Sequence, residues 1–105
     1  MATGKLGSVD IPAAANTTLY TVTAGLVSSF NLAFCNRGNE MAKVRVSIGA
    51  SDPLPKDYIV YDHLIPPGGE YERTGLVASS GEVVVVRSDK AGMSARAYGF
   101  EEAPL

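Results

Sequence analysis

Regularly spaced turn signals are the feature of this sequence that most limits its fold. Short combinations of Gly, Pro, Asn, Asp and Ser recur at intervals of about a dozen residues. They occupy positions 24–25, 37–39, 51–53, 66–69, 79–81 and 89–92. This rhythm is typical of an all-β sandwich or barrel, because each interval holds one short strand and its turn.

The segments between these turns alternate in the way a β-strand requires. Near the middle of the chain, Val44 and Val46 point to one face of a predicted strand, while Lys43 and Arg45 point to the other. The segment DYIVYDHLI also predicts a strand but does not fix its register, and no helical pattern of useful length is present. We therefore predict a single antiparallel β-sandwich of about seven to eight strands.

The length and the N-terminal sequence set the expected domain boundaries. A chain of 105 residues has the size of one domain. Pro12 and the Asn-Thr-Thr sequence that follows the alanines argue against a helix near the N-terminus. We expect residues 1–16 to form an extended N-terminal arm, residues 17–102 the β-sandwich, and residues 103–105 a C-terminal tail.

Composition and charge argue against several classes of partner. The net charge of −2 gives no electrostatic reason to bind nucleic acid or an anionic membrane. No apolar stretch is long enough to span a bilayer, and the N-terminus lacks the apolar core of a secretory signal. The single cysteine excludes an internal disulfide, so we expect synthesis in a cytoplasm. Charged residues make up 19% of the chain, below the usual value of about a quarter, which indicates that part of the apparent surface is covered by something else.

A run of four valines, Val83 to Val86, is apolar on both faces of its predicted strand. A half-exposed strand should alternate, because each valine left in water forfeits about 1.5–3 kcal/mol of burial energy. Either a loop of the same chain or another subunit must cover the second face, and the sequence leaves both alternatives open.

The residues that could support chemistry are few. A catalytic thiol needs a base, and nothing in the sequence brings the only histidine, His63, to Cys35. We expect Cys35 to be an inert, small, buried residue near a strand end, with a disulfide between subunits as the alternative. One cysteine and one histidine cannot supply the four ligands of a structural zinc site.

The remaining motifs give no stronger sign of catalysis. Asp52, Asp57 and Asp62 recur every five residues but lack the glycine and glutamate of an EF-hand, so a calcium-binding loop stays a minor alternative. The sequence has no phosphate-binding or nucleophile motif. We therefore predict a non-enzymatic protein without a cofactor, a metal site or catalytic residues.

Exposed basic residues and apolar residues of the arm and valine run are the candidates for an interface. An arginine paired with an acid on its own surface adds little stability, whereas the same arginine at an interface contributes more. The predicted interface residues are Lys5, Ile11, Arg37, Lys43, Arg45, Arg73, Val83, Val85, Arg87 and Arg96.

The phrases CNRG, YIVYD, ERTGLV, VRSD and GFEE carry a resemblance to a known group of proteins. From Thr17 to Glu102 the chain resembles small structural proteins of tailed bacteriophages, including cyanophages. The resemblance implies a virion part made of one β-sandwich. It brings no catalytic residues with it.

This resemblance implies a non-enzymatic structural component of a bacteriophage virion. We expect a capsid decoration, or cement, protein that binds the major capsid protein and stabilises the assembled shell as a homo-oligomer, with a trimer favoured. The alternatives are a tail, neck, baseplate or fibre-attachment accessory that binds tail proteins, and a module that binds the host surface. The implied location is the surface of the capsid or tail, after synthesis in the host cytoplasm, with no nucleic-acid or membrane partner.

Overall fold

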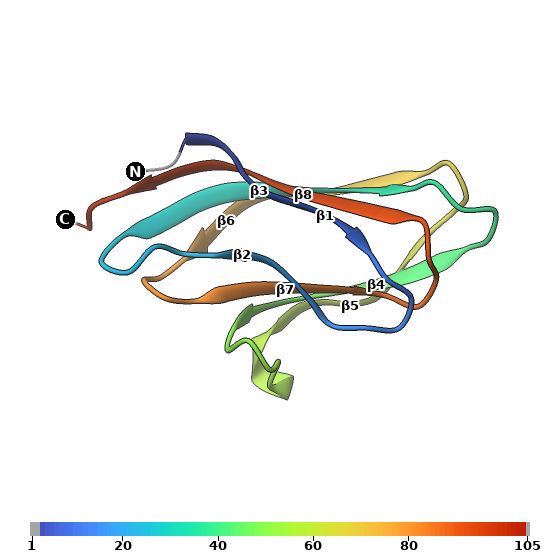
Figure 1. Cartoon of the computed structure of the whole chain (residues 1–105), viewed down its shortest axis with the longest axis horizontal. Helices are drawn as coiled ribbons and strands as arrows, with labels where there is room; N and C mark the ends of the chain where they lie inside the picture. The colour runs from blue at the N-terminus through green and yellow to red at the C-terminus, as the bar shows by residue number, and fades with distance from the viewer. Residues whose placement is uncertain (1–2, 105) are drawn as a thin grey trace.

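Two four-stranded antiparallel sheets pack face to face in the computed structural model, which describes residues 3–104 and confirms the predicted β-sandwich (Figure 1). The upper sheet of Figure 1 has the strand order β1-β8-β3-β6, and the lower sheet has the order β2-β7-β4-β5. The strands are β1 (Thr3–Ile11), β2 (Thr17–Thr21), β3 (Val27–Asn36), β4 (Ala42–Gly49), β5 (Tyr58–Ile65), β6 (Glu70–Ala78), β7 (Val83–Ser88) and β8 (Met93–Glu102), and a short 3₁₀ turn, η1 (Pro55–Asp57), precedes β5.

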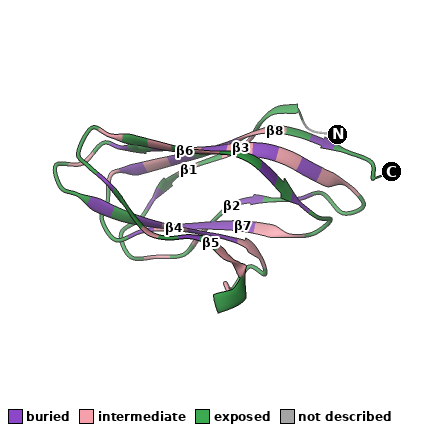
Figure 2. Cartoon of the chain, turned by 180° about the vertical axis from the view of Figure 1, so that it is seen from behind, coloured by how far each residue is buried: buried purple, intermediate pink, exposed green. Residues whose placement is uncertain are grey.

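The core lies between the sheets and is filled by alternate residues of the inner strands. Phe30 and Phe34 of β3 face Val44 and Val46 of β4 across this space, and all four side chains are buried. Figure 2 shows buried residues along the strands and exposed residues in most of the loops. The alternation of residues 43–46 in the sequence therefore separated the two faces of β4 correctly.

The N-terminal segment belongs largely to the upper sheet. The sequence predicted an extended arm over residues 1–16, and residues 3–11 are extended, but they pair with β8 from Thr3 opposite Phe100 to Ile11 opposite Met93. Val9 and Ile11 supply the inward side chains that hold this strand against the core. The sandwich therefore begins at residue 3 rather than 17, while residues 1–2 of the predicted arm and residue 105 of the predicted tail lie outside the described residues.

All four edge strands carry a register shift, in each case with an extra residue on the edge strand. The extra residue is Leu6 on β1 and Leu19 on β2, and the shifts lie between residues 73 and 76 on β6 and between residues 58 and 63 on β5. The inner pairs β3–β8 and β4–β7 run without a shift along their registered residues. Such bulges twist an edge and interrupt its row of hydrogen-bonding groups, which hinders pairing with another chain.

On the second face of the valine run, Val85 is buried by other residues of the same chain. Val84 and Val86 point into the core, and Val85 on the outer face is only 2% exposed in the single chain. On the same outer side of the lower sheet, the loop that contains η1 projects below β4 and β5 (Figure 1). No second subunit is needed to bury Val85, and of the predicted pair only Val83 keeps partial exposure.

Candidate functional site

A shallow, mostly basic hollow lies on the outer face of the lower sheet. Lys43 and Arg45 of β4 and Arg87 of β7 reach this face because their neighbours along each strand point into the core. Together with Asp62 and Asp89 they line a hollow of about 190 Å³. We call these five residues the basic hollow.

Arg45 is the best-fixed cation of the basic hollow. Its Nε donates a hydrogen bond of 2.7 Å to Oδ1 of Asp62, and its Nη2 donates a longer one of 3.4 Å to Oδ2. The guanidinium carbon also lies 4.2 Å from the ring centroid of Tyr61, within cation–π range. The hydrogen bond from Arg45 is the main reason that the pKa of Asp62 is lowered from its usual value.

A bulge in β5 places Asp62 beside Arg45. Val44 pairs with His63 and Val46 pairs with Val60, so two residues of β5 lie opposite Arg45 alone. Asp62 takes a φ of 55°, a left-handed conformation that aspartate and asparagine tolerate better than most residues. The bulge therefore presents Tyr61 and Asp62 to the same guanidinium.

The second carboxylate of the basic hollow is engaged by the backbone. Oδ1 of Asp89 accepts a hydrogen bond of 2.7 Å from the backbone N–H of Lys43, and the N–H of Asp89 donates back to the carbonyl of Lys43 at 3.1 Å. Within residues 3–104, neither the ammonium of Lys43 nor the guanidinium of Arg87 has a carboxylate oxygen within 4.0 Å. These two cations are therefore the free charges of the site.

Arg45 and Arg87 also stand directly opposite each other on the neighbouring inner strands β4 and β7. Like charges at directly opposed positions of an antiparallel pair destabilise the sheet. Lys43 and Arg87 both act on the carboxylate of Asp62 by Coulomb attraction, so the three cations share one local environment. The basic hollow thus concentrates positive charge on a chain whose net charge is −2.

An exposed apolar strip borders the basic hollow. It consists of Leu54 before η1 and Ile59, Tyr61 and Leu64 on the edge strand β5, and we call it the β5 strip. Tyr61 and Leu64 are 60% and 52% exposed. Tyr61 connects the β5 strip to the basic hollow, because its ring lies under the guanidinium of Arg45. The ring also packs edge-on against Tyr58 at a centroid distance of 5.2 Å.

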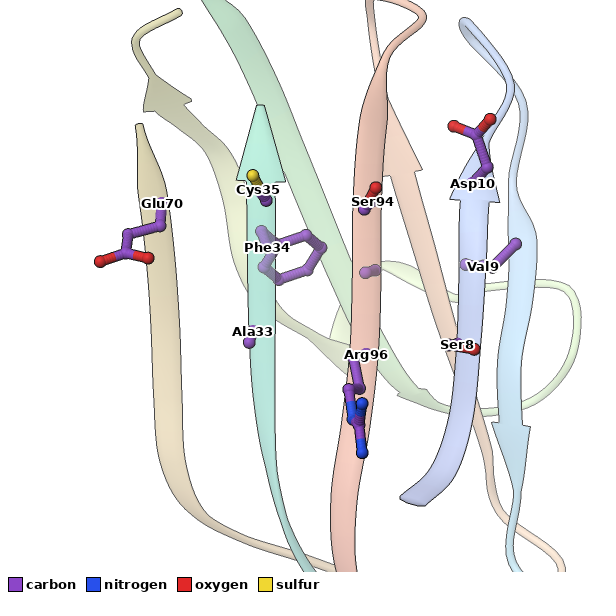
Figure 3. Close-up of a pocket in the computed structure, with 10 residues that line it drawn as sticks. Ser8, Val9, Asp10, Ala33, Phe34, Cys35, Glu70, Ser94 and Arg96 are labelled. Atoms are coloured by element: carbon purple, nitrogen blue, oxygen red, sulfur yellow. The ribbon is translucent and has the colours of Figure 1, made fainter. Parts of the chain in front are cut away.

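Cys35 is exposed, which corrects the expectation that it is buried. It lies on the outer face of the upper sheet, where no further layer covers the strand, and its register neighbours there are Ser94 and Glu70 (Figure 3). The small side chains around it floor a trough of about 520 Å³ that Asp10 and Arg96 also line. Among residues 3–104, Cys35 forms no disulfide, and its thiol is open to solvent.

The structure gives His63 a packing role and does not bring it to Cys35. The His63 ring stacks on Tyr71 of β6 with centroids 3.8 Å apart, and Tyr71 stacks in turn on Phe34 in the core at 6.2 Å. This series of rings links the edge strands of the two sheets. In the part of the chain that the structure describes, no three His, Cys, Asp or Glu side chains gather as a metal site would require, and no helix is long and apolar enough to cross a bilayer.

The other predicted interface residues are scattered. Arg37 pairs with Asp10 at the end of the upper sheet, and Arg73 donates a hydrogen bond of 3.3 Å to the carbonyl of Ile59 across the open edge. Lys5 and Arg96 are exposed on the strands of the upper sheet. Ile11, at 1% exposure, and Val85 are buried, so neither offers surface to a partner.

Three of the predicted residues, Lys43, Arg45 and Arg87, therefore meet in one site, and the sequence missed the two that complete it. Asp89 lies in one of the predicted turns. Its side chain accepts a hydrogen bond from the backbone N–H of Lys43 only because β4 pairs with β7. Asp62 lies in the segment whose register the alternation did not fix. Its position depends on a bulge for which the sequence carries no glycine or proline as a signal.

Comparisons with known proteins bring no further assignment. No family model matches the chain, and a search of curated proteins finds no significant match. The fold, the basic hollow and the β5 strip are therefore the structural basis for a functional proposal.

Proposed function

We propose that the protein is a non-enzymatic structural component of a bacteriophage virion, and within that class a capsid decoration protein. The resemblance of residues 17–102 to small phage structural proteins supports the virion role. The β-sandwich fold agrees with what that resemblance implies. The protein would bind the major capsid protein on the assembled shell and stabilise it.

The β5 strip is the observation that supports an assembly role best. It places several large apolar side chains in water along one edge strand and its preceding turn. Several large exposed apolar side chains on one strand and the turn before it favour an interaction with another protein. With the charged residues of the basic hollow beside it, this surface has the apolar centre and polar rim of a protein–protein interface.

The mechanism would be adhesive. Each copy would bury its β5 strip against the shell, and symmetric repetition would multiply a modest contact into a large gain in shell stability. We propose a trimer at a local threefold position of the shell, where three copies can bind symmetrically around one axis. The β5 edge would dock through its side chains, since its bulges interrupt the backbone ladder.

The stoichiometry in purified particles tests the location. A decoration protein should be present in numbers near those of the major capsid protein, measured by quantitative mass spectrometry. Particles that lack it should lose their contents at a lower temperature. A copy number far below that of the major capsid protein would overturn the decoration role and indicate a neck, tail, baseplate or fibre position.

A variant of the β5 strip tests the proposed contact. Changing Tyr61 and Leu64 to serine should abolish binding to shells prepared without the protein, measured by co-sedimentation. Val77→Ser is the matched control, because Val77 is 68% exposed on β6 of the other sheet. Equal binding by the double variant and the wild type would contradict the role of the β5 strip.

A further inference from the structure

We propose that the basic hollow is a binding site for a side-chain carboxylate of a partner protein, with Arg87 and Lys43 as the donors that reach it. This site is separate from the β5 strip in chemistry, and it stands whether or not the partner is a phage shell. It rests on the charge balance, the strand register and the shape of the hollow.

The charge balance leaves room for one anionic group. Three cations face two carboxylates in the basic hollow. Asp62 is engaged by Arg45, and Asp89 accepts the backbone N–H of Lys43, so neither carboxylate is spare. The site therefore carries about one uncompensated positive charge, with the donors of Lys43 and Arg87 free to take a partner.

The strand register shows that this arrangement opposes folding stability. Arg45 and Arg87 are directly opposed across β4 and β7, where like charges repel. A threonine or valine at position 87 would suit the strand better, both by β-propensity and by removal of the repulsion. A bound carboxylate beside Arg87 would offset this repulsion and accept charge-assisted contacts from Arg87 and Lys43.

The cations are held on the two inner strands of the lower sheet. β4 and β7 are inner strands whose mutual register has no shift, and Arg87 is half-buried there. Arg45 is fixed from the other side by Asp62 and by the ring of Tyr61. Donors on rigid strands lose little entropy when a ligand binds, so the site is organised before its partner arrives.

The same features favour a carboxylate over a phosphate. A planar carboxylate matches the fork of a guanidinium and neutralises a local charge of one. A phosphate dianion or a polyphosphate backbone would bring excess negative charge close to Asp62 and Asp89, on a chain that is already negative overall. A hollow of about 190 Å³ also has room for one carboxyl group with part of its stem.

A titration with a short acidic peptide tests the proposal on the full chain. The probe is a hexaglutamate peptide with both ends blocked, and the readout is the Nε–Hε NMR signals of Arg45 and Arg87. In the wild type we expect a saturable shift of both signals. In Arg87→Gln, followed by the Arg45 signal that remains, the affinity for the peptide should be about tenfold weaker, the loss of one charge-assisted contact. Arg96→Gln is the matched control, because Arg96 is exposed on an inner strand of the opposite sheet and should leave binding unchanged.

Thermal unfolding distinguishes this site from a purely structural arginine. Replacing a structural arginine would lower the melting temperature, whereas replacing Arg87 should raise it. Without peptide, Arg87→Gln should raise the melting temperature by about 1–4 °C, because it removes the opposed charge. The peptide should stabilise the wild type more than the variant. A lower melting temperature for Arg87→Gln would overturn the argument from repulsion.

Three binding results would overturn the site. They are unchanged peptide binding by Arg87→Gln, an equal loss of binding in Arg96→Gln, and displacement of the peptide by millimolar inorganic phosphate. The last result would assign the basic hollow to a free oxyanion. A blocked hexaglutamine peptide should give no shift, and a shift equal to that of hexaglutamate would show that charge plays no part.

Discussion

Tyr20 on β2 donates its hydroxyl hydrogen bond to the buried carboxylate of Glu101 on β8, and so joins the lower sheet to the upper one. Thr23 adds two hydrogen bonds of 3.0 Å to the same carboxylate, one from its backbone N–H and one from its hydroxyl. The last strand of the chain is thereby anchored to the segment between β2 and β3. Burial of the phenol, together with this carboxylate, raises the pKa of Tyr20 to about 12.

Replacing Tyr20 by phenylalanine should destabilise the protein. The ring would still pack edge-on against Phe30, but the buried carboxylate of Glu101 would lose one donor. We expect a loss of about 1–3 kcal/mol in the free energy of unfolding, measured by urea denaturation. Tyr98→Phe on the outer face of β8 is the control and should change stability little, whereas equal effects of the two variants would contradict the role of the contact.

Stability should also fall at alkaline pH because of Tyr20. Its pKa rises from 10.0 in the unfolded chain to about 12 in the fold, so the folded state holds the proton more tightly. The resulting stabilisation is complete below pH 10 and is lost as the pH rises towards 12. Urea midpoints measured from pH 9 to 12 should decline for the wild type and decline less for Tyr20→Phe; parallel curves would exclude this origin.

The Arg45–Asp62 pair should affect stability at the acid end. The pKa of Asp62 is lowered from 3.8 in the fold, so its contribution is present above that pH and is lost as the pH falls through the folded value. Asp62→Asn keeps the left-handed backbone and removes the titration, so its acid unfolding curve should be flatter below pH 4 or so. Asp52→Asn, in the exposed loop after β4, should match the wild type.

Gly7→Ala should weaken the attachment of the N-terminal strand. A Cβ at position 7 would lie 2.2 Å from the carbonyl oxygen of Leu19, so β1 and β2 could no longer approach as closely. We expect a loss of about 1–3 kcal/mol, the usual cost of overpacking, and faster amide hydrogen exchange over residues 3–11. Ser8→Ala, on the exposed face of the same strand, should have neither effect; a wild-type exchange rate in Gly7→Ala would contradict the close approach.

Cys35 should react with thiol reagents in the folded protein. Its side chain is exposed in an open trough, so the rate should lie within a few-fold of that of the urea-unfolded chain. Ellman's reagent and mass spectrometry would measure it. A reaction rate of the Cys35 thiol that is orders of magnitude slower in the native state would contradict its exposure and support the buried position that the sequence predicts.

The sequence predicts a strand well where its register is unbroken, and it fails where a bulge shifts the register. β4 keeps an unbroken register with β7, and its alternation correctly placed Val44 and Val46 on one face, which is the core face. On β1 the extra residue, Leu6, breaks the alternation, so the sequence does not show that this extended segment is a strand of the sandwich. On β5 the shifts hid the position of Asp62.

The candidate site was predictable only in part for the same reason. Lys43, Arg45 and Arg87 lie on inner strands, so their outward direction could be predicted from the sequence alone. Their closeness could not, because it depends on β7 pairing with β4, and several strand orders suit the same alternation. Cys35 is exposed because no further layer covers the outer face of the upper sheet. Alternation along a strand separates its two faces but does not predict whether the outer face is covered.

The bulges of the edge strands affect the tendency of the protein to aggregate at high concentration. In the proposed decoration role the chain would be made in many copies, and at high concentration an unbroken strand edge would favour fibril formation. Here the border of each sheet is interrupted on both sides, so neighbouring molecules offer one another no continuous backbone template. In the proposed role, contacts between molecules would then be made by side chains, and such contacts can dissociate and form again while a particle assembles.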